Sequence, residues 1–189
     1  MIQDHNSWRV CLSGDTDLNF LIYTATAYGL FDEKDSVWPP AKLFEASAAV
    51  VDELKVQWAS RWNQTMEYRA HGSQGGSVFV PPFEKVEQPE LREALIQAFP
   101  SFIRWWQMPA GGQKAMYAWE DKPNISSYVR ELEMELGRDH LSFYLNVDLV
   151  YGGIREPIEI GEEYMVMPIR GEYMLNKEWW KKKLAARIR

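Results

Sequence analysis

The run LSFYLNVDLVY, residues 141–151, constrains the fold more than any other stretch, because apolar positions alternate in it with partly polar ones. Successive side chains of a β-strand point to opposite faces of the sheet. One face of the predicted strand belongs to a core and carries Leu141, Phe143, Leu145, Val147, Leu149 and Tyr151. The opposite face carries Tyr144, Asn146 and Asp148, so the sequence predicts a sheet with one covered face and one polar face.

A long apolar stripe predicts the main helix of the fold. After Pro40, which suits the first position of a helix, apolar residues recur every three or four positions up to Trp62. This spacing predicts a long central helix near residues 40–63. Capping residues predict further helices after Asp15, Asn124 and Asn176.

Additional strands are expected at QKAMYAWED, residues 113–121, and within residues 156–175. Strands cluster late in the chain and do not alternate regularly with helices. We therefore expect an α+β fold in which a mainly antiparallel sheet of about four to six strands packs against several helices.

Length and composition indicate one soluble domain. The chain has 189 residues, of which 46% are hydrophobic and 25% are charged, so residues 1–189 are expected to form a single globular domain. The N-terminal stretch holds no long apolar run, and no segment is long and apolar enough for a membrane span. A single cysteine, Cys11, cannot form an internal disulfide, which favours a cytoplasmic location.

The charge distribution is uneven. The net charge of −6 argues against general nucleic-acid binding, which needs clustered Lys and Arg. The predicted C-terminal helix, residues 177–189, nevertheless holds six basic residues and one acidic residue. It is expected either to dock on the acidic body of its own chain or to meet an acidic partner or a nucleic acid.

No local motif specifies a reaction. None of the three histidines, His5, His71 and His140, is within three to five residues of another His or of Cys11. No local metal-ligand spacing therefore exists, and no metal or cofactor is expected. The glycine-rich stretch GSQGGS lacks the Lys that follows the glycines of a phosphate-binding loop. Catalytic residues remain unknown, and an enzyme is the less favoured interpretation.

Two classes of function are therefore weighed. The first is a protein-binding module, such as an inhibitor or an antitoxin-like or immunity-like neutraliser of a basic partner, because the chain holds nine Trp and nine Tyr. Its candidate contact residues are Trp38, Trp105 and Trp179, since helical spacing assigns the neighbouring Trp106 and Trp180 to the core. A homodimer is a further reading of the same aromatic content.

The alternative is an enzyme or a binder of a small ligand, such as a sugar, on the polar face of the sheet. Its candidate residues are Tyr144, Asn146 and Asp148, joined by Tyr117 and Trp119 from the neighbouring predicted strand. A hollow on that face would favour this hypothesis, and exposed tryptophans beside acidic residues would favour the first.

Overall fold

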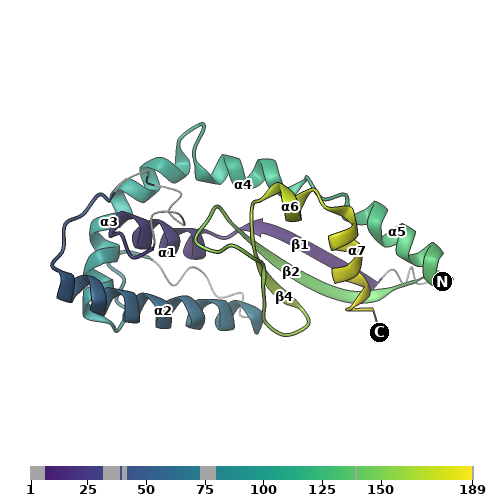
Figure 1. The fold of residues 1–189 in the computed structure, drawn as a ribbon, viewed down its shortest axis with the longest axis horizontal. Coiled ribbons are helices and arrows are strands. Elements are labelled where there is room, and N and C mark those ends of the chain that lie inside the picture. Colours follow the sequence, from purple (N-terminus) through teal and green to yellow (C-terminus); the bar gives the residue numbers. More distant parts are fainter. Residues whose placement is uncertain (1–6, 32–38, 40–41, 73–79, 139, 189) are drawn as a thin grey trace.

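The computed structural model describes residues 7–31, 39, 42–72, 80–138 and 140–188, which form an α+β fold around a four-stranded mixed sheet (Figure 1). Its strands are β1 (Ser7–Gly14), β2 (Ser142–Val150), β3 (Ile158–Glu159) and β4 (Tyr164–Pro168), in the spatial order β1-β2-β4-β3. β1, β2 and β4 are mutually parallel, and the short β3 pairs antiparallel with β4. The α+β class is confirmed, and the expectation of a mainly antiparallel sheet is wrong.

The parallel arrangement arises from β1. This strand pairs with β2 across 135 residues of chain, as Ser13 and Asp148 illustrate. Helices occupy the intervening chain, whereas the parallel strands β2 and β4 are joined by the short segment that contains β3. Trp8, Val10 and Leu12 alternate with Arg9 and Cys11 in β1, but no local signal relates this strand to the distant β2.

Seven helical segments are described: α1 (Thr16–Ala27), α2 (Ala48–Ala70), α3 (Pro89–Gln107), α4 (Gly112–Glu120), α5 (Ile125–Leu136), α6 (Gly171–Met174) and α7 (Lys177–Ala185). The predicted caps are confirmed. Asp15, Asn124 and Asn176 each accept a hydrogen bond from a backbone N–H in the first turn of α1, α5 and α7. Gly137 ends α5 with a left-handed φ of 61°, which glycine adopts without strain.

The long central helix lies further along the chain than predicted. It is α2, and it begins where the Ser47 hydroxyl accepts a hydrogen bond from the Val50 N–H at 3.4 Å. Residues 42–47 are not helical, and the expected start at Pro40 lies outside the described residues. Nothing breaks the helix at residue 63, so it continues to Ala70, two residues before a left-handed Gly72.

The segment predicted as a strand at 113–121 is instead the helix α4. Its buried members, Gly112 and Met116, are four residues apart, which is helical spacing. Met116 packs on Gly14 at the end of β1, where an added Cβ atom would lie 2.3 Å from the Met116 Cβ. The alternation in the sequence was therefore misleading, and the close approach of α4 to β1 needs glycine at position 14.

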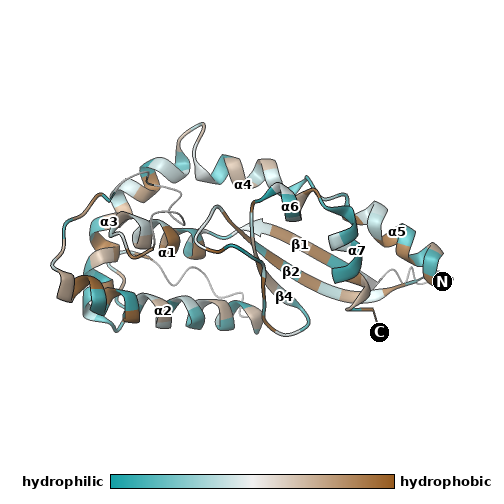
Figure 2. Cartoon of the chain, in the orientation of Figure 1, coloured by the Kyte–Doolittle hydropathy of each residue, from teal (hydrophilic) through white to brown (hydrophobic). Residues whose placement is uncertain are grey.

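The helices form two groups around the sheet. In Figure 1, α1, α2 and α3 gather at one end, and α4 and α5 follow the upper side. α4 contacts β1 and β2, and α5 contacts α7. Hydrophobic residues are concentrated on the strands and on the inner helix faces (Figure 2). The buried residues of both groups belong to one core cluster, which includes Phe20, Phe102, Leu145 and Trp180.

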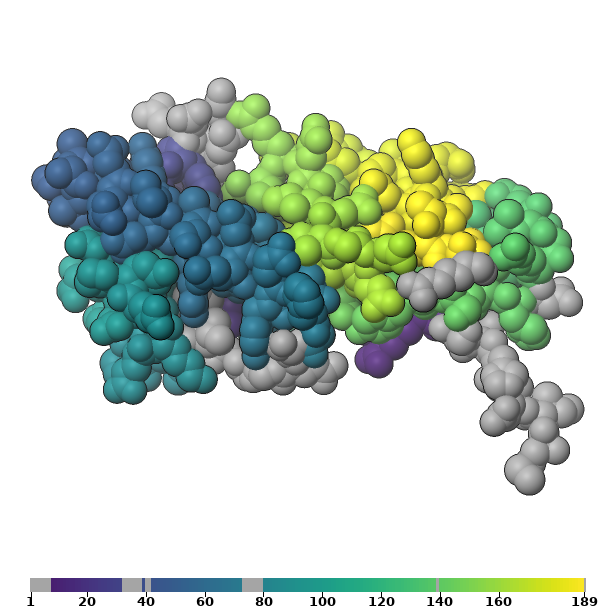
Figure 3. Space-filling view, turned by 90° about the horizontal axis from the view of Figure 1, so that it is seen from below, coloured from purple at the N-terminus to yellow at the C-terminus, as the bar shows by residue number. Residues whose placement is uncertain are grey.

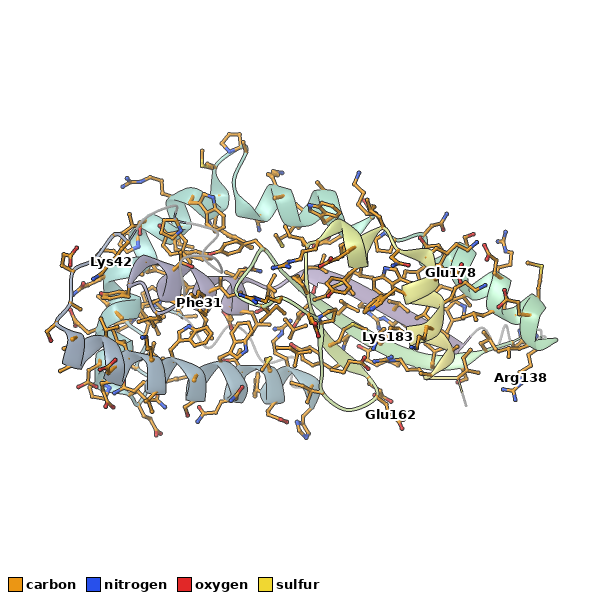
Figure 4. The ribbon with its side chains drawn as sticks, in the orientation of Figure 1. Phe31, Lys42, Arg138, Glu162, Glu178 and Lys183 are labelled. Carbon is orange, nitrogen blue, oxygen red and sulfur yellow. The ribbon has the colours of Figure 1, made fainter. Side chains whose placement is uncertain are left out.

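The basic C-terminal helix docks on its own chain. Lys177 and Lys181 of α7 form ion pairs with Glu131 of α5, at 2.7 and 3.5 Å. Lys183 and the buried Arg187 pair with Glu159 of β3. Figure 4 shows Lys183 on α7 above the turn that carries Glu162. Four of the five basic residues in the described part of 177–188 are thus neutralised within the molecule.

Candidate functional site

A cavity of about 630 Å³ lies on the polar face of the sheet. The three predicted residues of β2, Tyr144, Asn146 and Asp148, all line it. The C-terminal end of α2 contributes to its wall. The complete lining is Cys11, Ser13, Arg69, Ala70, His71, Gly72, Tyr144, Asn146, Val147, Asp148, Glu163 and Tyr164.

Strand register brings the floor of the cavity together. Ser13 of β1 is aligned with Asp148 of β2, and Cys11 is aligned with Asn146. Asn146 is also aligned with Tyr164 of β4. Aligned residues of neighbouring strands point to the same face, so three strands supply one continuous polar surface.

Arg69 joins two carboxylates beneath this surface. Its Nη2 donates to Oδ1 of Asp148 at 2.9 Å, and its Nε donates to Oδ2 of the same residue. Its Nη1 lies 2.7 Å from Oδ2 of Asp15. All three guanidinium nitrogens therefore contact carboxylates, and the last turn of α2 is fixed to β2 and to the start of α1.

Two hydroxyl groups complete the contacts of Asp148. Tyr164 donates to Oδ2 at 2.7 Å, and Ser13 donates to Oδ1 at 3.4 Å. Asp148 is only 3% exposed, so these donors and Arg69 replace the water that a buried carboxylate loses. Both hydroxyl oxygens retain lone pairs that can accept a hydrogen bond from a ligand.

Burial shifts the pKa values of this network. Burial raises the pKa of Asp15 to about 7, and the neighbouring charge of Asp148 adds to the rise, while Arg69 opposes it. Burial also raises the pKa of Tyr164, with a further contribution from Asp148. Burial alone would lower the pKa of Arg69, but its hydrogen bond to Asp148 and the two carboxylate charges raise it. Arg69 therefore stays protonated and Tyr164 keeps its hydroxyl proton at neutral pH.

Further polar groups of the cavity belong to β1 and β2, while His71 follows α2 and Glu163 precedes β4. The Tyr144 hydroxyl donates to Oδ1 of Asn146 at 2.6 Å, which leaves the amide nitrogen of Asn146 to donate elsewhere. Cys11 accepts a hydrogen bond from Nε of Arg9 at 3.1 Å. The half-buried ring of Tyr144 adds a flat apolar surface beside these groups.

The other predicted site residues do not reach the cavity. Tyr117 and Trp119 lie on α4, whose Met116 packs on Gly14, and Gly14 faces the opposite side of the sheet from Ser13. Their predicted place beside Tyr144 therefore needs correction, because α4 is a helix on the covered face.

Trp105 and Trp179, the two candidate contact residues whose exposure would indicate a docking surface, are half-buried. Trp105 contacts Tyr23 and Tyr151, with ring centroids 5.6 and 4.9 Å apart. Trp179 packs on Tyr173 and Trp180, and Nζ of Lys183 lies 5.5 Å from its ring centroid, as expected for a cation–π contact. Trp106 and Trp180 are buried, which confirms their assignment to the core. Trp38 lies outside the described residues.

The donor set does not suit a metal ion. Within the described ranges, no three His, Cys, Asp or Glu side chains are placed to hold one. The guanidinium of Arg69 already lies between the carboxylates of Asp15 and Asp148, where a cation would need to bind. The described helices likewise include none that is both long and apolar enough to cross a membrane.

Comparison with known proteins identifies no relative of this chain. No protein-family model, no curated protein and no solved structure matches this chain. The geometry of the chain itself is therefore the basis for a proposal about its function.

Sequence reasoning found one strand of the site and missed the residues around it. Asp15 was expected only as a helix cap, Arg69 and Tyr164 carried no local signal, and Ser13 carried only the alternation of its strand. Arg69, Ser13 and Tyr164 reach Asp148 through contacts separated by 16 to 135 residues in the chain. The alternation of β1 was a usable signal for Ser13, because it resembles the alternation of β2.

Proposed function

We propose that the cavity on the polar sheet face binds a small, hydroxyl-rich molecule that is neutral or positively charged. The observation that supports this most is the continuous polar floor from β1, β2 and β4 in a hollow of about 630 Å³. Cavities of this size are typical of small-molecule sites. The floor offers the amide nitrogen of Asn146 as a donor and the hydroxyl oxygens of Ser13 and Tyr164 as acceptors, which suits hydroxyl groups, because each hydroxyl both donates and accepts.

The charge balance of the site sets the ligand class. Arg69 is the one guanidinium among the lining residues, and its nitrogens are already engaged by Asp15 and Asp148. Glu163 adds a further negative charge to the lining. The local net charge is therefore negative, so a phosphate or carboxylate ligand would be repelled and an ammonium group would be attracted.

The test compares three ligands with one scaffold: glucose, glucosamine and glucose 6-phosphate, measured by saturation-transfer NMR and calorimetry. Glucose and glucosamine should bind more tightly than the phosphate. Asn146→Ala should weaken binding by roughly tenfold, because a lost hydrogen bond at a polar site costs about 1.4 kcal/mol. Asn63→Ala, on the exposed face of α2, is the matched control.

Preferred binding of the phosphate, or equal binding by the Asn146→Ala and wild-type proteins, would refute the proposed site. The protein-binding hypothesis remains a proposal beside it. None of the eight tryptophans in the described ranges is among the exposed side chains, so that hypothesis needs a surface other than the tryptophans.

A further inference from the structure

A second hollow lies at the other end of α2, away from the sheet. Its volume is about 440 Å³, and it lies between the N-terminal halves of α2 and α3. Figure 3 shows α2 in blue beside α3 in teal on this side of the molecule. We call it the α2–α3 groove, lined by Tyr28, Glu45, Ala46, Val50, Leu54, Pro89, Glu90, Glu93, Ala94 and Gln97.

The floor of the α2–α3 groove is apolar. Leu54, Ala94 and Tyr28 are nearly fully buried beneath it, with exposed fractions of 1, 2 and 5%. Val50 forms an exposed wall and is 40% accessible. Apolar side chains exposed around a hollow gain free energy when another apolar surface covers them.

The rim of the groove is acidic. Glu45, Glu90 and Glu93 surround the apolar floor. The side chain of Glu45 is 92% exposed and pairs with Lys42 at 3.3 Å, so the charge that the rim offers to a partner comes mainly from Glu90 and Glu93. Glu90 accepts a hydrogen bond from Gln57 at 2.5 Å, and Glu93 accepts one from Gln97 at 3.2 Å. Both donors are neutral amides, and neither Glu90 nor Glu93 has a cationic partner among the residues that the structure describes.

The combination of an apolar floor and an acidic rim defines the occupant. We infer that the α2–α3 groove docks an amphipathic helix of a partner protein, whose apolar face covers Val50 and Leu54 and whose Lys or Arg residues meet Glu90 and Glu93. A helix satisfies its own backbone hydrogen bonds, and the side-chain walls of this groove offer no strand edge to an extended peptide.

This surface is independent of the proposed ligand cavity. The residues that line the two hollows do not overlap. The basic helix α7 of the same chain is already engaged with α5 and β3, so it is not the occupant. The overall net charge of −6 also favours the approach of a basic partner.

The test uses an amphipathic peptide of about 18 residues, built from Leu, Ala and Lys with Leu on one face, and measures binding by fluorescence anisotropy. A matched peptide carries Glu in place of Lys. The Lys peptide should bind the wild-type protein, more weakly at high salt, and the Glu peptide should not.

Paired variants locate the binding surface. Val50→Asp and Glu93→Lys should each weaken binding of the Lys peptide by at least about tenfold. Val56 and Glu67 lie at exposed positions of α2 outside the groove. Val56→Asp and Glu67→Lys should therefore change the affinity for the Lys peptide by less than about twofold. Val50 is 40% exposed, so its variant should fold, which far-UV circular dichroism and thermal melting would check.

Three results would overturn the inference. The first is no binding of the Lys peptide to the wild-type protein. The second is an equal effect of the groove variants and their controls, which would indicate unspecific attraction to an acidic surface. The third is a homodimer, detected by sedimentation and abolished by Val50→Asp, which would make a second copy of the chain the occupant.

Discussion

Asp15 has two roles that favour opposite protonation states of its side chain. It caps α1 through a 2.8 Å hydrogen bond from the Leu18 N–H, a contact that favours an ionised side chain. Burial next to Asp148 disfavours the same charge and raises the pKa of Asp15 from 3.8 to about 7. The folded protein therefore holds a proton on this group over a range in which the unfolded chain has lost it.

The consequence is a pH-dependent contribution to stability. Because the folded pKa of Asp15 lies above its unfolded value, this contribution is present at low pH and is lost as the pH rises from about 4 through about 7. Asp15→Asn keeps the capping oxygen and cannot ionise. The wild-type protein loses this contribution as the pH rises, and the variant does not. Urea titrations should therefore show that the free energy of unfolding of Asp15→Asn, relative to wild type, increases as the pH rises through this range.

Asp52→Asn on the exposed surface of α2 serves as the control for replacing an aspartate by asparagine. A difference for Asp15→Asn that does not change with pH would contradict the raised pKa of Asp15.

Gly14 illustrates how one missing side chain positions a whole helix. An added Cβ atom would lie 2.3 and 2.4 Å from Cβ and Cγ of Met116. Gly14→Ala should therefore lower the free energy of unfolding by about 1–3 kcal/mol, as overpacked cores do. Chemical denaturation of Gly14→Ala, Met116→Ala and the double variant measures this effect.

The double variant should lose less stability than the sum of the two single losses, because each change makes room for the other. Gly171→Ala is the matched control, since its new methyl group would have only an ordinary 3.8 Å contact with Leu175. Additive losses would show that Gly14 and Met116 are not coupled.

At the scale of elements, Arg69 fixes the end of α2 to the sheet. Replacing it with Met would leave Asp15 and Asp148 buried beside each other without a cation. We expect Arg69→Met to cost about 3–5 kcal/mol, the usual loss when one partner of a buried ion pair is removed. Urea denaturation at neutral pH measures the change.

Adding Asp148→Asn should recover part of this loss, since it removes the buried carboxylate whose charge Arg69 no longer compensates. Arg130→Met, at an exposed position of α5, controls for the loss of an arginine. A loss for Arg69→Met no larger than that of Arg130→Met would contradict the role of Arg69 in fixing α2.

The elements divide sharply into those that the sequence predicts and those that it does not. Helix boundaries set by local caps, at Asp15, Asn124 and Asn176, were predicted because the cap and its partner lie three residues apart. The polar row of β2 was predicted for the same local reason. Strand direction and the Arg69 contacts were missed, because both depend on residues that meet only after the chain has crossed the molecule.

At the scale of the whole molecule, the helical end and the sheet share one core. The contacts of α1 with α2 and α3, and of α4 with β1, connect buried residues from both ends into a single cluster. We therefore expect one cooperative unfolding transition, with the midpoints from tryptophan fluorescence and far-UV circular dichroism coinciding. Two separate midpoints would show that the chain contains two units, against the predicted single domain.

The position of α2 connects the two hollows of the molecule. Its 23 residues span about 34 Å, and its two ends border the two hollows. The Arg69 end is held by three guanidinium contacts. The opposite half is held as well, because Gln57 accepts a hydrogen bond from the Leu91 N–H at 3.0 Å and Nε1 of Trp58 donates to the Leu21 carbonyl at 2.8 Å. One helix, fixed in both halves, therefore forms part of the wall of both hollows.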